Sequence, residues 1–216
     1  VDTPVDEVIQ TIEKYNLVAV PVVDSIGRLV GRITVDDVMD EVREQAERDY
    51  QLASGLSQDV ETDDSVLRQT SARLPWLLIG MLGGIGNSMI LGNFDTTFAA
   101  HPEMALYIPL IGGTGGNVGT QSSALVVQGL ANSSLDANNT WKQILKESVV
   151  ALINATIISM LVYIYNFVRF GPTATVSYSV SLSLFAVVMF ASIFGTLVPM
   201  TLEKLKIDPA IATGPF

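Results

Sequence analysis

The chain has 216 residues, a formal charge of −10, no cysteine and a mean hydropathy of +0.41, which is high for a water-soluble domain. The lack of cysteine excludes a disulfide-stabilised secreted domain, and a pI near 4.4 argues against a nucleic-acid-binding protein, which needs a basic face. Of the 22 acidic residues, 16 lie in positions 1–64. We therefore expect an acidic, water-facing first third joined to a membrane-embedded remainder.

The first fifty residues carry the pattern of a small α/β domain. Apolar residues at helical spacing predict a helix over Val5–Tyr15, and β-branched runs predict strands over Val18–Val23 and Leu29–Thr34. A long helix should follow over Val35–Tyr50. This order, with the sequence VAVPVVDSIGRLVGRITVDDVMD at 18–40, resembles one CBS domain. Such domains normally occur in pairs, so we expect the chain to be part of a longer protein.

A short motif within that segment concerns nucleotides. Gly31, Thr34 and Asp37 match the G-x-x-T-x-x-D pattern of nucleotide-binding CBS domains. Glycine would let the backbone approach a ligand such as ATP, and Asp37 would accept hydrogen bonds from ribose hydroxyls. The alternative is a purely structural one, in which the motif is a strand-end glycine followed by an aspartate at a helix N-terminus.

The predicted helix after this motif is strongly acidic. Asp36, Asp40 and Glu44 follow i, i+4 spacing, and positions 36–64 contain eleven carboxylates. Stacked like charges destabilise a helix. They form either a solvated face or a divalent-cation site, and carboxylate oxygens suit Mg²⁺ or Ca²⁺. Two or three converging carboxylates would bind weakly, as a sensor of cellular Mg²⁺ requires.

Four long stretches without a charged residue fill the rest of the chain. Each could cross a hydrocarbon core of about 30 Å at about 1.5 Å per residue. We expect membrane spans at about 74–94, 104–131, 146–169 and 176–202, with a fifth starting at 209. The predicted fold is mainly α, a polytopic transmembrane helical bundle preceded by a partial α/β CBS domain and a connecting helix. The domain limits are 1–49 for the CBS domain, 50–73 for the connecting helix and 74–216 for the transmembrane domain.

Basic residues orient the spans. With the acidic domain in the cytoplasm, six flanking Lys and Arg residues lie inside and one lies outside. The inner six are Arg68, Arg73, Lys142, Lys146, Lys204 and Lys206, and the outer one is Arg169. This agrees with the positive-inside bias. We expect a multi-pass protein of the plasma membrane with a cytoplasmic CBS domain.

The second span departs from an ordinary lipid-facing helix. Positions 107–123 read YIPLIGGTGGNVGTQSS, with a proline, five glycines and a polar run at membrane depth. Such a sequence predicts a broken helix that faces protein or a water-filled cavity, as ion paths do; close packing alone is the alternative. In the first span, Gly80 and Gly84 form a small-xxx-small pair that permits close helix contact.

The segment at 107–123 is similar to the signature of MgtE-type magnesium transporters, and LEKLKIDPAIATGP at 202–215 resembles the family's connection into its fifth span. The resemblance implies a homodimeric Mg²⁺ channel or transporter in a lipid bilayer, held shut by cytosolic Mg²⁺. Positions that resemble the family's regulatory metal sites are Asp37, Asp40 and Asp208, to which the acidic helix adds Asp36 and Glu44. Pore-lining candidates are Asn117, Thr120 and Gln121, with Asp95 near the outer mouth.

By the same resemblance, the family's acidic fifth-span residue lies beyond Phe216. From Met104 to Leu135 the chain offers only neutral oxygens, so we expect these 216 residues alone not to conduct Mg²⁺ selectively. Two alternatives stay open: another CBS-linked divalent-cation carrier, such as an efflux protein, and a membrane-anchored nucleotide sensor without a pore. The sequence has one histidine and no cysteine, and it shows no nucleophile–base pair, so we do not expect the protein to be an enzyme.

Overall fold

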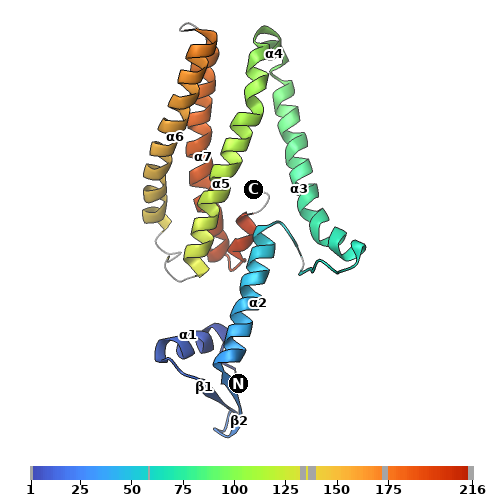
Figure 1. The fold of residues 1–216 in the computed structure, drawn as a ribbon, viewed down its shortest axis with the longest axis vertical. Coiled ribbons are helices and arrows are strands. Elements are labelled where there is room, and N and C mark those ends of the chain that lie inside the picture. The colour runs from blue at the N-terminus through green and yellow to red at the C-terminus, as the bar shows by residue number, and fades with distance from the viewer. Residues whose placement is uncertain (1, 58, 132–134, 136–139, 172–174, 214–216) are drawn as a thin grey trace. The chain divides into compact units, whose positions relative to one another are not determined.

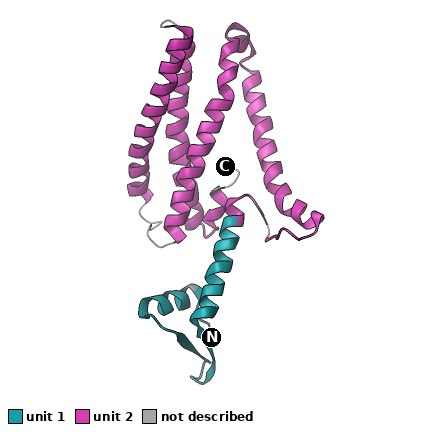
Figure 2. Ribbon diagram, viewed as in Figure 1, with its two compact units in different colours: residues 1–50 teal, residues 51–216 magenta. Residues whose placement is uncertain are grey.

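A computed structural model of the chain describes residues 2–57, 59–131, 135, 140–171 and 175–213. The chain divides into two compact units, residues 1–50 and 51–216 (Figure 2). Helices dominate both units, and one two-stranded sheet lies in the first. The expected mainly α fold class is therefore confirmed.

The first unit contains α1 (Val5–Tyr15), β1 (Ala19–Val23), β2 (Leu29–Thr34) and most of α2 (Val35–Ala53) (Figure 1). The two strands pair antiparallel, with Ala19 opposite Thr34. The sequence predicted these elements in this order. The second helix ends three residues later than expected, at Ala53.

A tight turn joins the two strands. The Asp24 carboxylate Oδ1 accepts hydrogen bonds from the backbone amides of Ile26 (3.0 Å) and Arg28 (2.9 Å). Gly27 has a φ of +81°, in the left-handed region that favours glycine. Aspartate and glycine at these positions therefore fix the register of the hairpin.

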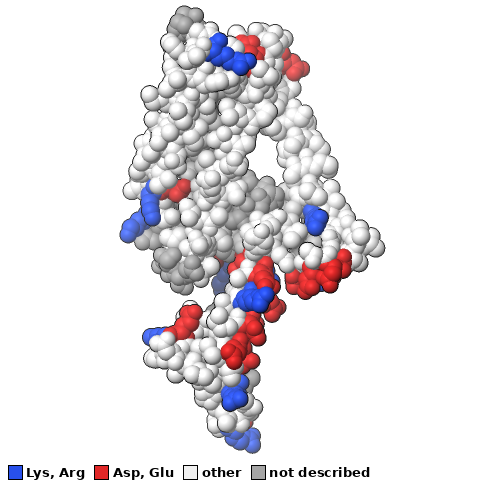
Figure 3. All heavy atoms as spheres, in the orientation of Figure 1, with Lys and Arg blue, Asp and Glu red and all other residues white. Residues whose placement is uncertain are grey.

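The second unit is a set of long helices joined by short segments (Figure 1). In chain order these are α3 (Val66–Gly92), α4 (Asp95–Ala100), η1 (Pro102–Tyr107), α5 (Ile108–Ala131), α6 (Thr140–Phe170), α7 (Thr175–Lys204) and η3 (Pro209–Thr213). The helices α3 and α6 run in one direction and α5 and α7 in the other. Charged side chains gather toward the two ends of this unit, leaving a broad uncharged band between them (Figure 3).

Three described helices are long and apolar enough to cross a membrane: α3, α6 and α7. Three of the four expected spans are thus supported. Although α5 has 24 residues, it is not among them, because its glycines and polar residues lower its hydropathy. The buried core of the unit lies between α6 and α7, around Ala155, Leu184 and Val188.

The expected break in the second span is wrong. From Ile108 to Ala131 the segment forms one continuous α-helix, α5, preceded by the 3₁₀ helix η1. Two of its glycines, Gly115 and Gly119, instead allow close packing against α7. A Cβ added to Gly195 would lie 2.5 Å from the carbonyl oxygen of Gly119, and one added to Gly115 would lie 2.6 Å from Val187 Cγ1. The two backbones touch where neither has a side chain.

The first-span glycines behave differently. A Cβ added at Gly80, Gly83, Gly84 or Gly86 would meet no atom of the described residues within 4 Å. The small-xxx-small pair therefore has no packing partner within the described part of this single chain.

The connecting helix expected at 50–73 is also not one helix. The structure ends α2 at Ala53 and begins α3 at Val66, with a loop between them. Gly55, at a φ of +79°, turns the chain, and the Ser65 hydroxyl caps α3 by accepting from the Arg68 amide at 3.4 Å. Pro75 therefore lies inside α3, which begins at Val66.

Candidate functional site

The helix α5 separates two cavities in the second unit. One, of about 610 Å³, lies along its glycine-rich side, and we call it the glycine cavity. It is lined by Asn87 of α3, by Gly112, Gly115, Gly116, Gly119, Thr120 and Ser123 of α5, by Val187, Phe190, Ala191, Phe194, Gly195 and Val198 of α7, and by Ala212. Its wall is largely apolar, with three hydrogen-bonding side chains.

The other cavity, of about 490 Å³, is richer in polar groups, and we call it the polar cavity. It is lined by Val118, Gln121, Ser122, Leu125, Gln128 and Gly129 of α5, by Leu135, by Gln143, Lys146, Glu147, Val150 and Asn154 of α6, and by Ser192 of α7. Three glutamines, an asparagine and one residue of each charge line it. It can therefore hold water, which needs polar partners.

The predicted pore-lining residues do not share one surface. Thr120 lines the glycine cavity, and Gln121 lines the polar cavity. Asn117 is exposed and lines neither. Asp95 is the exposed first residue of α4, and it also lines neither. Because successive residues of a helix point about 100° apart, Thr120 and Gln121 face opposite flanks of α5.

The sequence reasoning missed Glu147. Its Oε1 accepts hydrogen bonds from the hydroxyls of Ser122 on α5 (2.7 Å) and Ser192 on α7 (2.5 Å). Glu147 directly precedes the charge-free stretch that begins at Ser148, so the sequence alone placed it at the flank of a span. Neither serine carried a signal that it would meet a carboxylate.

The acidic face of α2 is partly neutralised by its own arginines. Arg48 bridges Glu44 (2.7 Å) and Glu41 (3.2 Å). Asp36 and Asp40 are exposed, and among the described residues neither forms an ion pair. Arginine therefore relieves the repulsion near the middle of the helix and leaves the two aspartates available.

Asp37 takes part in a capping box at the start of α2. Its Oδ2 accepts from the backbone amide (2.8 Å) and the hydroxyl (2.6 Å) of Thr34, and the Asp37 amide faces the Thr34 hydroxyl at 3.4 Å. The side-chain and backbone hydrogen bonds from Thr34 hold the pKa of Asp37 below its ordinary value. Gly31 lies in β2, where an added Cβ would meet nothing within 4 Å. The structural alternative thus accounts for Thr34 and Asp37, whereas the described residues place no requirement for glycine at position 31.

Asp208 belongs to the second unit, where its Oδ1 accepts from the Ala210 amide at 2.8 Å and so starts η3. In the part of the chain that the structure describes, no three His, Cys, Asp or Glu side chains converge as a metal ion would require. The regulatory metal site at Asp36, Asp37, Asp40, Glu44 and Asp208 stays a prediction.

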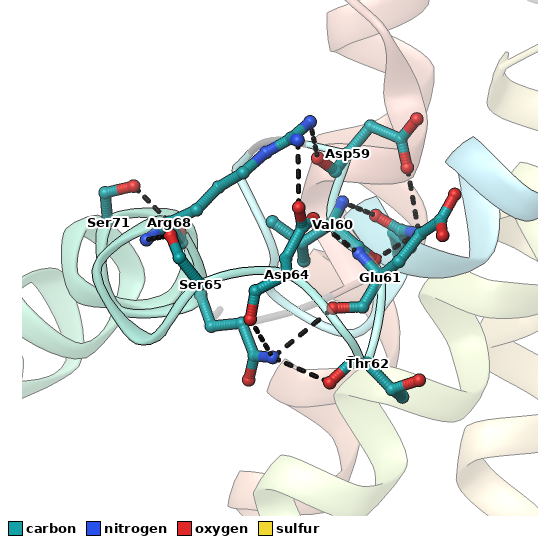
Figure 4. A network of polar contacts seen from close by, with 10 residues as sticks. Asp59, Val60, Glu61, Thr62, Asp64, Ser65, Arg68 and Ser71 are labelled. Atoms are coloured by element: carbon teal, nitrogen blue, oxygen red, sulfur yellow. Dashed lines mark hydrogen bonds and ion pairs between the residues drawn. The ribbon is translucent and has the colours of Figure 1, made fainter.

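The loop before α3 satisfies its own polar groups (Figure 4). Gln69 Nε2 lies within hydrogen-bond distance of three backbone oxygens, those of Glu61, Thr62 and Asp64, at 3.1–3.3 Å. Asp64 accepts from the Glu61 amide and from Arg68, each at 2.9 Å. The Asp64 carboxylate is therefore used to shape the loop.

Comparison with known proteins links both units to one group of proteins. Residues 108–216 match the MgtE family, described as divalent cation transporters, and residues 1–44 match the CBS domain. The chain is similar to proteins named magnesium transporter MgtE from Thermus thermophilus, with 34% identity over 221 residues, and from Bacillus subtilis, with 33% over 211 residues. These alignments cover 100% and 98% of this chain and 48% and 47% of the relatives.

A third protein of that name, from Enterococcus faecalis, is 32% identical over 211 residues, which is 98% of this chain and 46% of the relative. The chain spans about half the length of the curated relatives it matches. The family match begins at the first residue of α5. It includes the contact between Gly119 and Gly195, which we call the glycine crossing, and the residues of α5, α6 and α7 that line the two cavities. The chain belongs to the MgtE family of divalent cation transporters.

Proposed function

We propose that the complete protein carries Mg²⁺ across the plasma membrane, with the CBS domain in the cytoplasm. The observation that carries this proposal is α5, a charge-free helix with hydrogen-bonding side chains, packed on α7 through glycines, within the family match. The relatives that align with nearly the whole chain are named magnesium transporters, which favours Mg²⁺ as the transported ion.

The chemistry of Mg²⁺ favours hydroxyl and amide ligands on this path. Mg²⁺ gives up its water reluctantly, so a selective path should contact the hydrated ion through oxygen atoms. Asn117 and Thr120 are exposed one turn apart on α5 and supply such oxygens. We propose that a second copy of the chain covers this side, which makes the transporter a homodimer. Gln121, on the other flank, would then contact water in the polar cavity.

Regulation by intracellular Mg²⁺ is the second part of the proposal. Asp36 and Asp40 are exposed without ion pairs among the described residues, and the capping bonds to Asp37 both use Oδ2. These carboxylates, with Glu44 and Asp208, would bind Mg²⁺ when its concentration is high and favour a closed state. When Mg²⁺ is scarce, repulsion among them would favour the open state. The capping box explains Thr34 and Asp37 without ATP, so the proposal includes no nucleotide.

Ion flux into liposomes tests the proposal. The full-length protein is reconstituted with a Mg²⁺-sensitive dye inside, and Mg²⁺ is added outside. We expect uptake well above that of protein-free liposomes, and slower uptake when the cytoplasmic side is preloaded with millimolar Mg²⁺. A protein that binds adenine nucleotides in calorimetry but passes no Mg²⁺ would be a membrane-anchored sensor and would overturn the proposal. Flux that occurs only outward would identify an efflux carrier.

A further inference from the structure

Three helices of the second unit meet at one carboxylate. Glu147 lies in the second turn of α6. A single oxygen of its carboxylate, Oε1, accepts hydrogen bonds from the hydroxyls of Ser122 on α5 and Ser192 on α7. The two serine oxygens lie 3.0 Å apart. Each hydroxyl has one proton, so when both point at the carboxylate this separation is a close contact and not a third hydrogen bond.

The arrangement is specific to these two serines. Ser122 and Ser192 are 5% and 2% exposed, and α7 has no charged residue between Thr175 and Leu202. Four other buried serines on the same helices have hydroxyls without a partner among the described residues: Ser123, Ser159, Ser177 and Ser181. Hydrogen bonds to an ionised carboxylate are shorter and roughly twice as strong as neutral ones. The contact with Glu147 therefore distinguishes this pair from the remaining serines.

The contact lies at the turn of α5 where the helix meets α7. Gly119, which touches Gly195, is one turn before Ser122 on α5, and Gly195 is one turn after Ser192 on α7. The residues between Gly119 and Ser122 are Thr120 and Gln121, which line the two cavities. The rotation of this single turn about the helix axis therefore decides which cavity each of these two side chains enters.

We infer that Ser122, Ser192 and Glu147 form a clamp across the three helices that sets the rotation of α5. In this role the two serines are positioning residues for ion transport, acting through Thr120 and Gln121. The inference rests on the proposed transport function. The clamp requires the hydroxyl groups of the two serines to keep α5 in place. If the helices were held by packing alone, only the volume of these side chains would matter.

The test uses the full-length protein and introduced cysteines, since the described chain has none of its own. Thr120→Cys and Gln121→Cys are each made in the protein with both serines intact and in the Ser122→Ala/Ser192→Ala variant. A positively charged, water-soluble methanethiosulfonate reagent labels the thiol in liposomes. Any native cysteine elsewhere in the full-length protein is first replaced by serine. The ratio of the two labelling rates reports the rotation of α5, and Mg²⁺ uptake is measured on the same double-serine variant without cysteines.

We expect the double-serine variant to lose about tenfold in uptake, the factor that corresponds to about 1.4 kcal/mol, and to change the labelling ratio by a similar factor. The single variant Ser192→Thr keeps the hydroxyl, so its uptake and its labelling ratio should match those of the protein with both serines intact, unlike those of Ser192→Ala. The matched control is Ser181→Ala, which removes a buried hydroxyl of α7 that has no described partner and should change neither. If the double variant does not elute as a single species in detergent, Ser192→Ala alone takes its place.

An unchanged labelling ratio in the serine variants would overturn the clamp, as would a Ser192→Thr variant that behaves like Ser192→Ala. A parent protein that passes no Mg²⁺ would instead overturn the proposed transport function. The labelling ratio needs no transport, so it would still decide the clamp in that case.

Discussion

The contact between Gly119 and Gly195 offers a direct test of why α5 is rich in glycine. Replacing Gly195 by alanine places a Cβ 2.5 Å from the Gly119 carbonyl oxygen and 3.2 Å from the Gly119 Cα and carbonyl carbon. All three atoms belong to a helix backbone and cannot rotate away. Ordinary van der Waals contact begins at 3.4 Å, so the helices must separate by roughly 0.9 Å at this point.

Overpacking of this kind costs about 1–3 kcal/mol. For a domain of about 150–250 residues, the range into which the second unit falls, about 2–4 °C of melting temperature is lost per kcal/mol, so this unit should melt about 2–12 °C lower in Gly195→Ala than in a variant without the clash. Gly113→Ala in α5 is that variant, because its Cβ would meet no atom of the described residues of the chain within 4 Å. It gains the better helix propensity of alanine, about 1 kcal/mol, and shows what the substitution does by itself.

A third variant should have a melting temperature between those of the other two. Gly115→Ala brings its Cβ to 2.6 Å from Val187 Cγ1, which belongs to a side chain that can shift, so its loss should be smaller than that of Gly195→Ala. Thermal unfolding of the full-length protein in detergent, followed by size-exclusion chromatography, measures all three. Equal melting temperatures for Gly195→Ala and Gly113→Ala would refute the close crossing of α5 and α7.

Four other predictions concern the first unit, the candidate regulatory carboxylates and assembly. Thr34→Ala should cost about 1 kcal/mol at the start of α2, seen as faster hydrogen exchange there. Because the pKa of Asp37 is lowered in the folded state, its contribution is complete above the ordinary pKa of 3.8 and lost as pH falls below it; Asp37→Asn should remove this pH dependence. Neutralising Asp37, Asp40 and Asp208 together should let uptake continue at high internal Mg²⁺, whereas normal inhibition would make them a solvated face. Light scattering in detergent should give the mass of a dimer, and a clean monomer would contradict the homodimer.

The sequence predicted the first unit well because its signals are local. The spacing of apolar residues sets α1, and the Asp24 and Gly27 turn sets the hairpin, so both follow from neighbours along the chain. The end of α2 and the start of α3 were less predictable. There the loop depends on hydrogen bonds from the Gln69 side chain to the carbonyls of Glu61 and Thr62. No short sequence pattern predicts these contacts.

The second span shows where sequence reasoning fails. Five glycines and a proline in one helix predicted a broken backbone, yet α5 is continuous. In isolation these glycines would weaken the helix, but its hydrogen bonds are protected by the neighbouring helix, and the lack of side chains allows that neighbour to approach. The pattern therefore identified the right segment and gave the wrong conformation. Asn117, Thr120 and Gln121 were grouped together because they are close in sequence, whereas the helix points Gln121 to a different side from Asn117 and Thr120.

The glycine crossing and the clamp should act independently. Separating α5 from α7 by roughly 0.9 Å at Gly195 would widen the 3.0 Å gap between the Ser122 and Ser192 hydroxyl oxygens, one turn away, to about 3.9 Å. Glu147 Oε1 lies 2.7 Å and 2.5 Å from these two oxygens, and one acceptor can stay within about 3.0 Å of two oxygens at this wider separation. Gly195→Ala should therefore leave both hydrogen bonds of the clamp in place. In a double-mutant cycle on Mg²⁺ uptake, the combined variant of Gly195→Ala and Ser192→Ala should lose about the product of the two single losses, since changes that act independently are additive in free energy. A combined variant that loses clearly less than this product would mean that the separation of α5 from α7 already breaks the clamp, and that Glu147 reaches its serines only when the two helices touch at Gly119 and Gly195.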